Sequence, residues 1–355
     1  MEAFTNKSLK EYNYYGVDVV AETFYAISEQ GELTNFVGKV STLDDLLVLG
    51  GGSNLLLTKN VPIVLFIAIT GRTIIEDTEE TVLVELGAGE EWHDFVTWAV
   101  DHDYEGVENM ALIPGTIGGA VVGNIAAYGQ NLSDVFVSAE VFDVVSGKFS
   151  TFTKEECRLQ YRDSRFKHER QYIVVSARFE LKKQYEALET TYHERKGRYG
   201  SLEEVLQETA KPPYSIRDVY RAVITIRTRK LPNPAEEGTV GSFFVNPTVS
   251  KEKFAELSQL VPELQSYPVE DLRYTQKNWQ EIQANYVKIP AGRLLDELGW
   301  RGKWEGNVGV SAKHALCVIS NRNATGKEIF EFTEKMRKSV LEAYGVELES
   351  EIRIV

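Results

Sequence analysis

The residues best suited to bind an anion lie between Val48 and Leu57, where an apolar stretch is interrupted by Gly50-Gly51-Gly52-Ser53-Asn54. Glycine has no Cβ, so consecutive glycines let the backbone adopt positive φ angles and approach a ligand closely. Successive amides in such a turn form a concave anion site, to which Ser53 and Asn54 add short polar side chains. The pattern predicts a phosphate or pyrophosphate site, and a plain glycine turn between two strands is the alternative.

A second glycine-rich segment runs from Ala111 to Gly129. It holds too many small residues for an ordinary surface loop, so we expect its backbone to approach another group closely. Upstream, an apolar run at 81–86 is followed by a glycine turn at 87–91 and by apolar residues at helical spacing from Trp92 to Ala99. This order predicts a strand, a turn and a helix.

The elements that must position these segments follow from hydrophobic periodicity. A continuous run rich in β-branched residues at 63–69 is typical of a strand buried on both faces. Residues 182–213 are polar and are predicted to be irregular. Further strands are expected at 24–27, 138–145, 173–181 and 315–319, with an extended end at 347–355, and helices at 42–46, 219–229, 251–260, 291–298 and 327–344, the last with Ile329, Phe332, Met336 and Val340 on its buried face.

Composition limits the class of protein. The chain has 355 residues, of which 43% are hydrophobic and 26% charged, as in ordinary globular proteins. No apolar run is long enough to span a membrane, and the first residues carry no secretory signal, so we expect a cytoplasmic protein without a membrane partner. The net charge of -14 disfavours nucleic acid as a partner.

The residues that commonly bind metals show no ligand spacing. Cys157 and Cys317 lie far apart in sequence, so the pattern predicts thiols rather than a disulfide framework or a zinc site. The five histidines are equally scattered, and His93 falls on the helix predicted after the glycine turn, where a cap or a solvent-facing role is expected. We therefore expect no metal.

Several strings, in order along almost the whole chain, resemble the UDP-N-acetylenolpyruvoylglucosamine reductase family. They are residues 50–54, Val-Glu-Asn-Met-Ala-Leu-Ile-Pro-Gly at 107–115, 124–129, Tyr-Arg-Asp-Ser at 161–164, Arg-Lys-Leu-Pro-Asn-Pro at 229–234, Gly-Ser-Phe-Phe at 241–244, Ala-Gly at 291–292 and the closing 348–353. The resemblance implies an α+β protein with a two-lobed FAD-binding domain of the vanillyl-alcohol-oxidase-like type and a separate α+β substrate-binding domain.

Two breaks in the sequence agree with this organisation. One lies near Gly71, and the other is the proline pair at 232 and 234, which fixes φ and removes two backbone donors. We therefore expect a first FAD-binding lobe at 1–70 together with 347–355, a second lobe at 71–231, and the substrate-binding domain at 232–346.

The resemblance also implies the reaction. NADPH reduces FAD, and the reduced flavin delivers hydride to the enolpyruvyl ether of a UDP-amino sugar, which yields UDP-N-acetylmuramate in the cytoplasmic part of peptidoglycan synthesis. The partner would be this nucleotide sugar, and the enzyme is expected to be a monomer. The glycine turn contains no histidine, so FAD is expected to be noncovalent.

The same resemblance assigns cofactor contacts to three stretches of backbone. They are Gly50, Gly51, Gly52, Ser53 and Asn54 in the first stretch, Ile113, Pro114, Gly115, Thr116, Gly118 and Gly119 in the second, and Asn124, Ala127, Tyr128 and Gly129 in the third.

Three residues match the catalytic positions of the family. Arg162 would hold the substrate carboxylate, and a surface ion pair with Asp163 is its alternative role. Ser242 would give the proton to the enolate carbon. Glu351 would assist the enolate as a protonated acid or position a water, with Glu349 as the competing candidate.

Residues matching the substrate contacts of the family are Tyr161, Tyr199, Lys230, Asn246 and Tyr267. Tyr199 would close over the substrate, with Tyr192 as its competitor. Lys230 could instead be an ordinary cation at a helix C-terminus. Val245 stands where a lysine is common in the family, which lowers the expected local charge.

Two other functions would use a similar chain. One is an oxidase or dehydrogenase of alcohols or lactones built on the same type of FAD domain, and the other is a nucleotide-sugar sensor without activity. Neither needs Arg162, Ser242 and Glu351 together, so their joint presence favours the reductase.

Overall fold

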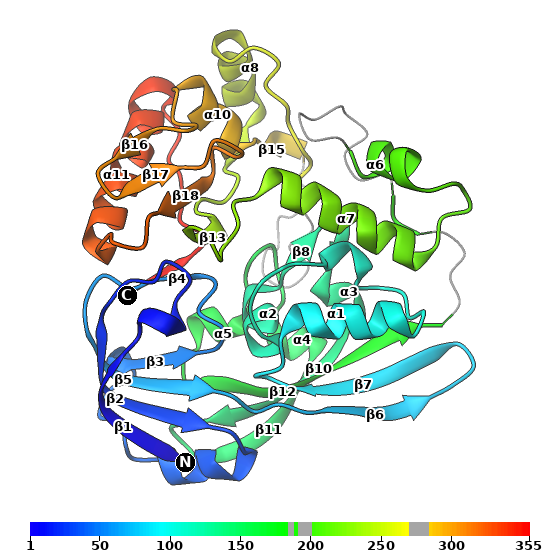
Figure 1. Ribbon diagram of the computed structural model, residues 1–355, viewed down its shortest axis with the longest axis vertical. Coiled ribbons are helices and arrows are strands. Elements are labelled where there is room, and N and C mark those ends of the chain that lie inside the picture. The colour runs from blue at the N-terminus through cyan, green and yellow to red at the C-terminus, as the bar shows by residue number, and fades with distance from the viewer. Residues whose placement is uncertain (184–187, 191–200, 270–283) are drawn as a thin grey trace. The chain divides into compact units, whose positions relative to one another are not determined.

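The computed structural model describes residues 1–183, 188–190, 201–269 and 284–355 (Figure 1). The chain forms two compact units. Unit 1 comprises Met1–Lys7, Ala21–Gly51 and Val61–Arg229, and unit 2 comprises Ser8–Val20, Gly52–Asn60 and Lys230–Val355. The divide thus falls inside the glycine turn. The finer division into two lobes and a substrate domain stays a prediction.

A mostly parallel sheet occupies one part of unit 1. Its strands are β1 (Glu2–Ser8), β2 (Val20–Ile27), β5 (Val61–Ile67) and β3 (Leu46–Leu49), in that spatial order. β5 pairs in parallel with both β2 and β3. Its residues Val64 and Leu65 are fully buried although they point to opposite faces, which confirms the strand predicted from the β-branched run.

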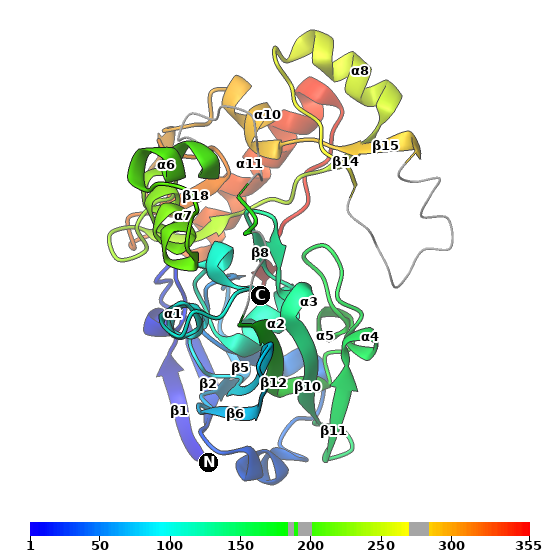
Figure 2. The ribbon, with the colours of Figure 1, turned by 90° about the vertical axis from the view of Figure 1, so that its right-hand side faces the viewer.

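The second sheet of unit 1 is antiparallel and carries helices on one face. Its order is β11 (Lys148–Thr153), β10 (Phe136–Asp143), β12 (Tyr172–Lys182), β7 (Thr81–Gly87) and β6 (Arg72–Asp77). Helices α1 (Trp92–Asp101), α2 (Ile117–Gly123) and α3 (Leu132–Val135) cover this sheet in both ribbon views (Figures 1 and 2). The predicted order of strand, glycine turn and helix is confirmed in β7 and α1.

Aromatic rings fix α1 on the sheet. Trp92 and Phe95 lie about one helical turn apart. The centres of their rings are 6.0 and 5.3 Å from the centre of the Phe179 ring in β12. All three side chains are almost completely buried. Aromatic pairs at such distances add favourable edge contacts to the burial of apolar surface. The start of α1 is therefore a rigid part of unit 1.

The remaining described helices of unit 1 include three that the sequence analysis did not predict, α4 (Lys154–Cys157), α5 (Arg165–His168) and α6 (Leu202–Thr209). Helices α4 and α5 are short, and α7 (Ile216–Lys230) confirms the helix predicted at 219–229. The prediction of irregular structure across 182–213 is wrong for α6. Ser201 and Glu204 form a capping box there, and the apolar residues of the helix are buried, so capping and burial outweigh the polar composition.

Unit 2 is built on an antiparallel sheet ordered β13 (Gly238–Ser242), β18 (Cys317–Ser320), β17 (Val308–Val310) and β16 (Trp304–Glu305). Helices α8 (Lys251–Leu260), α10 (Ala291–Glu297) and α11 (Gly326–Tyr344) match their predicted positions closely. Two smaller pairs complete the unit: β14 (Thr248–Ser250) with β15 (Tyr286–Lys288), and β4 (Leu55–Leu56) in parallel with β19 (Arg353–Ile354). The extended end predicted at 347–355 is a strand only in β19.

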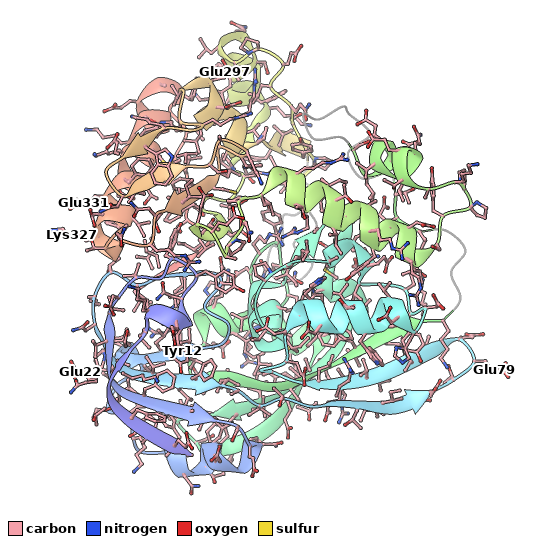
Figure 3. All side chains as sticks on the ribbon, viewed as in Figure 1. Tyr12, Glu22, Glu79, Glu297, Lys327 and Glu331 are labelled. Carbon is pink, nitrogen blue, oxygen red and sulfur yellow. The ribbon has the colours of Figure 1, made fainter. Side chains whose placement is uncertain are left out.

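The longest described helix, α11, shows how sequence pattern becomes packing. Thr325 and Glu328 form a capping box at its start, and Gly345 ends it with a φ of 63°. The four residues predicted for its inner face are all buried. Figure 3 shows Lys327 and Glu331 on the outer side of the helix. Among the described helices, none is both long and apolar enough to cross a membrane.

Replacement of Phe332 by alanine tests this packing. The ring is 3% exposed and lies 5.4 Å from the ring of Trp300, so its removal leaves a cavity. We expect a loss of about 3–5 kcal/mol in the free energy of unfolding, measured by urea denaturation. Glu331→Ala, one position earlier on the exposed face, should change it by less than about 0.5 kcal/mol. Equal effects of the two variants would contradict the assigned face.

Candidate active site

The two glycine-rich segments lie against each other in unit 1. A β-carbon added to Gly51 would be 2.9 Å from the Cα of Gly115, and one added to Gly50 would be 2.6 Å from Oγ1 of Thr116. Both distances are shorter than real β-carbons tolerate, so glycine is required at position 51, which meets backbone, and is favoured at position 50, which meets a side chain. The structure thus brings together the first two of the three stretches predicted to bind the cofactor.

The amides of the glycine turn are available to a ligand. Within the described ranges, the backbone amides of Gly51 and Gly52 donate to no protein acceptor. At the start of α2, by contrast, the amide of Gly118 already donates to the carbonyl of Ala88 at 2.8 Å. The amides of Gly51 and Gly52 therefore stay available to an anion, whereas that of Gly118 does not. The use of the turn as an anion site stays a prediction.

Asn124 terminates α2 in the left-handed conformation, with a φ of 40°. Its Nδ2 donates to the carbonyl of Gln160 at 2.6 Å, which fixes the side chain. Its Oδ1 is buried and has no hydrogen-bond partner among the described residues. A buried acceptor of this kind costs free energy unless a bound group satisfies it, so Asn124 is placed as a cofactor contact would be.

The third predicted stretch forms a tight turn between β8 (Ala126–Ala127) and β9 (Gln130–Asn131), with positive φ angles at Tyr128 and Gly129 of 46° and 88°. Asn109 Nδ2 donates to the carbonyl of Tyr128 at 2.7 Å and so holds the turn. Asn109 itself lies on the 3-10 helix η4 (Glu108–Met110). The side chain of Asn109 therefore ties η4, which precedes the second stretch, to the third stretch.

A carboxyl group that the sequence analysis missed supports this turn. Glu108 is completely buried and accepts hydrogen bonds from the amides of Gly106 and Val107 and, at 2.6 Å, from Nε2 of Gln130. Burial raises the pKa of Glu108, and these hydrogen bonds oppose the rise. The sequence feature that could have predicted the buried Glu108 is the presence of a charged residue within the mostly apolar run at 107–113.

Arg162 adopts a left-handed conformation with a φ of 52°, which is unusual for a residue with a side chain. Its Nη2 donates to the carbonyl of Ala126 at 2.8 Å, and its own carbonyl accepts from Nζ of Lys167 at 2.6 Å. Asp163, the alternative partner considered above, pairs with His168 at 2.8 Å. The contact with Ala126 places Arg162 beside the predicted cofactor turn. Its strained backbone is of the kind found at functional sites.

Ser242 is aimed by an irregularity at the end of β13. Thr239 pairs with Ile319 and Ser242 with Cys317, so β13 contains one extra residue between these pairs. Gly241, inside this bulge, has a φ of 78° and open space where a β-carbon would point. A bulge redirects the side chains that follow it, and bulges are frequent beside active sites. Ser242 is half-buried as a result of this placement.

Glu351 lies on a segment that pairs with the residues after Ser242. Its amide donates to the carbonyl of Phe243 at 2.9 Å, and the amide of Val245 donates to the carbonyl of Glu349 at 3.0 Å. Unit 2 therefore brings Ser242 and Glu351 onto adjacent strands of backbone. Glu351 is half-buried whereas Glu349 is exposed, which favours Glu351 as the candidate acid.

Asn54 joins the same cluster of unit 2. Its Nδ2 donates to the carbonyl of Glu351 at 3.4 Å, and its carbonyl accepts from the amide of Arg353 at 3.1 Å. The end of the glycine turn is thus fixed to the C-terminal segment that carries Glu351. These contacts give Asn54 a structural role beside its predicted one.

The residues predicted to contact the substrate lie on different elements of the two units. Tyr161 contacts Arg162, whose guanidinium carbon is 5.9 Å from the ring centre. Asn246 Oδ1 accepts from the amide of Ala291 at 3.1 Å, at the start of α10. Tyr267 exchanges backbone hydrogen bonds with Lys288. Lys230 is the last residue of α7, and both Tyr199 and Tyr192 lie outside the described residues.

His314 is a second residue that sequence reasoning passed over. Burial, together with the nearby charges of Lys230 and Arg301, lowers its pKa to about 3, so the ring is neutral at physiological pH. Its Nδ1 faces the amide of Leu316 at 3.2 Å, which assigns the ring proton to Nε2. His314 therefore offers a neutral N–H donor close to Lys230. The sequence analysis missed this role because it considered the histidines only as possible metal ligands.

Cys157 and Cys317 are buried thiols, as predicted. Burial raises the pKa of Cys157 to about 12, so that thiol is not a nucleophile. In the described parts of the chain, no group of three or more histidine, cysteine, aspartate or glutamate side chains could hold a metal ion.

Comparison with known proteins decides the family. Residues 233–355 match the model described as UDP-N-acetylenolpyruvoylglucosamine reductase, C-terminal domain, and residues 40–153 match an FAD binding domain. The chain is 38% identical to the UDP-N-acetylenolpyruvoylglucosamine reductase of Flavobacterium johnsoniae over 100% of both chains. It is also 38% identical to the Pseudomonas aeruginosa protein of that name over 97% of this chain and 96% of the other. The chain belongs to the UDP-N-acetylenolpyruvoylglucosamine reductase family.

Solved structures agree on the fold. The Thermus caldophilus UDP-N-acetylenolpyruvylglucosamine reductase aligns with a TM-score of 0.63 and 23% identity over 99% of this chain and 98% of the other. A VAO-type flavoprotein of Myceliophthora thermophila aligns with a TM-score of 0.50 and 12% identity over 92% of this chain and 70% of that one. The predicted α+β fold of the vanillyl-alcohol-oxidase type is therefore confirmed.

FAD is the cofactor, because the matched FAD-binding domain at 40–153 contains all three stretches described above. The residues present fit it. The close approach of Gly51 to Gly115 leaves no room for side chains, the amides of the glycine turn can meet the pyrophosphate, and Asn124 Oδ1 offers an acceptor.

Gly51→Val should give a folded protein that has lost its FAD and its yellow colour, because the new side chain would collide with the backbone at Gly115. The measurement is the ratio of flavin to protein absorbance after purification. Gly31→Val is the matched control, since a β-carbon at Gly31 meets open space. A normal flavin content in Gly51→Val would remove the turn from the cofactor site.

Proposed function

We propose that this chain uses NADPH and bound FAD to reduce UDP-N-acetylglucosamine enolpyruvate to UDP-N-acetylmuramate, as a monomer in the cytoplasm. The observation that carries the proposal is the pairing of the segment of Ser242, set by the bulge at Gly241, with the segment of Glu351. An oxidase on the same FAD domain has no use for a serine and a carboxyl group held together. The full-length family match supports the same activity.

The bound flavin supplies the hydride, which no side chain can donate. Hydride addition to the terminal carbon of the enol ether leaves negative charge at the next carbon, delocalised into the substrate carboxylate as an enolate. Catalysis then requires a group that holds this charge and a group that delivers a proton. The residues of the chain supply both.

Arg162 is proposed to hold the carboxylate. Its guanidinium presents several N–H donors in one plane, and a planar fork matches the two carboxylate oxygens in a way that a lysine ammonium cannot. The contact from Nη2 to the carbonyl of Ala126 orients this fork. A fixed donor stabilises developing charge without a cost of reorganisation during the reaction.

Ser242 is proposed to deliver the proton. A serine hydroxyl is a weak acid in water, so it can serve only when it is held close to a strongly basic carbon. The bulge supports this role, because Phe243 and Phe244 directly after it are buried and fix the strand that carries Ser242. Glu351, half-buried on the neighbouring segment, would support the enolate as a protonated acid or through a water.

The remaining proposed contacts concern the nucleotide sugar and the flavin. Lys230 and Asn246 would meet the diphosphate and its neighbours, and the ring of Tyr161, Tyr199 or Tyr267 would contact the sugar nucleotide. The flavin contacts proposed are Gly50, Gly51, Gly52, Ser53, Asn54, Ile113, Pro114, Gly115, Thr116, Gly118, Gly119, Asn124, Ala127, Tyr128 and Gly129.

Substrate dependence separates this function from its rivals. The purified protein should consume NADPH rapidly only when the enol sugar is present, and the amount of reduced sugar should match the NADPH oxidised. Absorbance at the NADPH band and chromatography of the sugar measure the two. Oxygen-dependent turnover of an alcohol, or no turnover of the enol sugar, would support the oxidase or the sensor instead.

Arg162→Lys should retain FAD but turn over roughly 10- to 100-fold more slowly, because one ammonium replaces a bidentate contact to a charged group. Arg158→Lys is the matched control: Arg158 is also a left-handed arginine, with a φ of 49°, but it is exposed and pairs with Glu169. Steady-state rates measure both. Equal rates in wild type and Arg162→Lys would return Arg162 to a structural role.

Ser242→Ala should leave the reduction of FAD by NADPH nearly unchanged, because no proton goes to the enolate in that half-reaction. Reoxidation by the enol sugar should slow by roughly 10²–10⁴-fold, the usual effect of a positioned acid. Ser242→Cys should recover part of the rate. Anaerobic stopped-flow absorbance times the two steps separately. Equal slowing of both would indicate displaced flavin, and a fast second step would assign the proton to another group.

A further inference from the structure

The first turn of α1 holds the segment that leads into the proposed flavin contacts at 113–116. The indole Nε1 of Trp92 donates to the carbonyl of Met110 at 3.1 Å, and the amide of Trp92 donates to the carbonyl of Gly115 at 2.9 Å. Between these two points, the amide of Leu112 donates to Nδ1 of His93 at 3.1 Å. Two consecutive residues of one rigid helix therefore hold the segment at three points.

Leu112 is the strained residue of this segment. Its φ of 57° is unfavourable for a side chain of its size. Its amide is held by His93, and its carbonyl accepts from Nη2 of Arg227 in α7 at 3.3 Å. A strained conformation persists only where its surroundings fix it, and here both polar groups of the residue are held.

The ring of His93 is itself fixed. It stacks on the ring of Tyr220 with 6.0 Å between centres and 16° between planes. The hydroxyl of Tyr220 is hydrogen-bonded to Oγ1 of Thr97, one turn further along α1, at 2.9 Å. Because Nδ1 accepts the amide of Leu112, the neutral ring carries its proton on Nε2.

We propose that His93 is a positioning residue for the flavin, whose neutral ring locks Leu112 in its left-handed conformation and thereby sets the backbone of residues 113–116 against the cofactor. The inference rests on the proposed flavin contacts of that segment. It gives a role to a histidine for which the sequence predicted only a cap or a solvent-facing position.

Protonation of His93 abolishes the acceptor at Nδ1 and releases Leu112. Burial lowers the pKa of His93, and Arg227 of α7 lowers it further, while the adjacent Asp94 acts in the opposite direction. The ring of Tyr220 also packs on that of His93. Since the pKa lies below the ordinary value of 6.5, the holding form is complete above that pH and is lost as the pH falls through the lowered pKa.

Three variants of the FAD-containing protein test the proposal. His93→Phe keeps an aromatic ring for Tyr220 but removes the acceptor, whereas His93→Asn keeps an acceptor oxygen near the position of Nδ1 and does not titrate. His102→Asn is the control, because His102 caps the other end of α1 and is exposed. Flavin released into the filtrate after serial dilution and ultrafiltration is measured between about pH 5 and pH 8.

We expect His93→Phe to release FAD about tenfold more readily than wild type at pH 8, because one hydrogen bond from the partly buried amide of Leu112 is lost. Wild type and His102→Asn should release more FAD as the pH falls, whereas His93→Asn should show a weaker pH dependence. Hydrogen exchange of the peptide containing Leu112 should be faster in His93→Phe, with or without FAD.

Two results would overturn the inference while leaving the proposed function intact: His93→Phe retaining FAD as wild type does, or His93→Asn keeping the full pH dependence of wild type. A wild-type protein that binds no FAD would instead refute the proposed function itself. If His93→Phe does not fold, the comparison of His93→Asn with wild type decides the question.

Discussion

The close approach of Gly51 to Gly115 is the constraint on which the cofactor site depends. A β-carbon at Gly51 would lie 2.9 Å from the Cα of Gly115, so position 51 accepts no side chain. Within the described ranges, the amides of Gly51 and Gly52 have no protein acceptor and stay available to a ligand. The buried side chains of Trp92, Glu108 and Asn109 hold the 107–116 segment and the adjoining turn in place. Buried side chains thus hold in place the backbone that is proposed to contact the cofactor.

In unit 2 the corresponding constraint is the pairing of the C-terminal segment with residues 243–245. Backbone hydrogen bonds, rather than side-chain contacts, set the distance between the strands that carry Ser242 and Glu351. Such bonds tolerate substitution of the side chains they position, so the chemistry of this pair can be altered one residue at a time. The extra residue of the bulge lies directly before Ser242, and a bulge changes the direction of the side chains that follow it.

Secondary structure could be predicted from the sequence where buried residues recur at a regular spacing. The inner face of α11, the strand β12 and the start of α1 were predicted because apolar residues recur at 3.6 or 2 residues. The pattern was insufficient for β6, whose residues are all exposed, and for α6, whose capping box outweighs its polar composition. The glycine turn was predicted to be an anion site from its residue types, whereas the candidate catalytic residues were assigned only through the resemblance to a family. The left-handed backbone of Arg162 and the contact of His93 with Leu112 depend on the tertiary structure, which no local pattern encodes.

The central claim is that electrons pass from NADPH to the flavin and from the flavin to the enol sugar on this one chain. Its most direct test follows the flavin absorbance of the wild-type protein under argon. Stoichiometric NADPH should bleach the oxidised band, and subsequent addition of UDP-N-acetylglucosamine enolpyruvate should restore it without oxygen. A flavin that stays bleached after the sugar is added, and recovers only when air is admitted, would contradict the account.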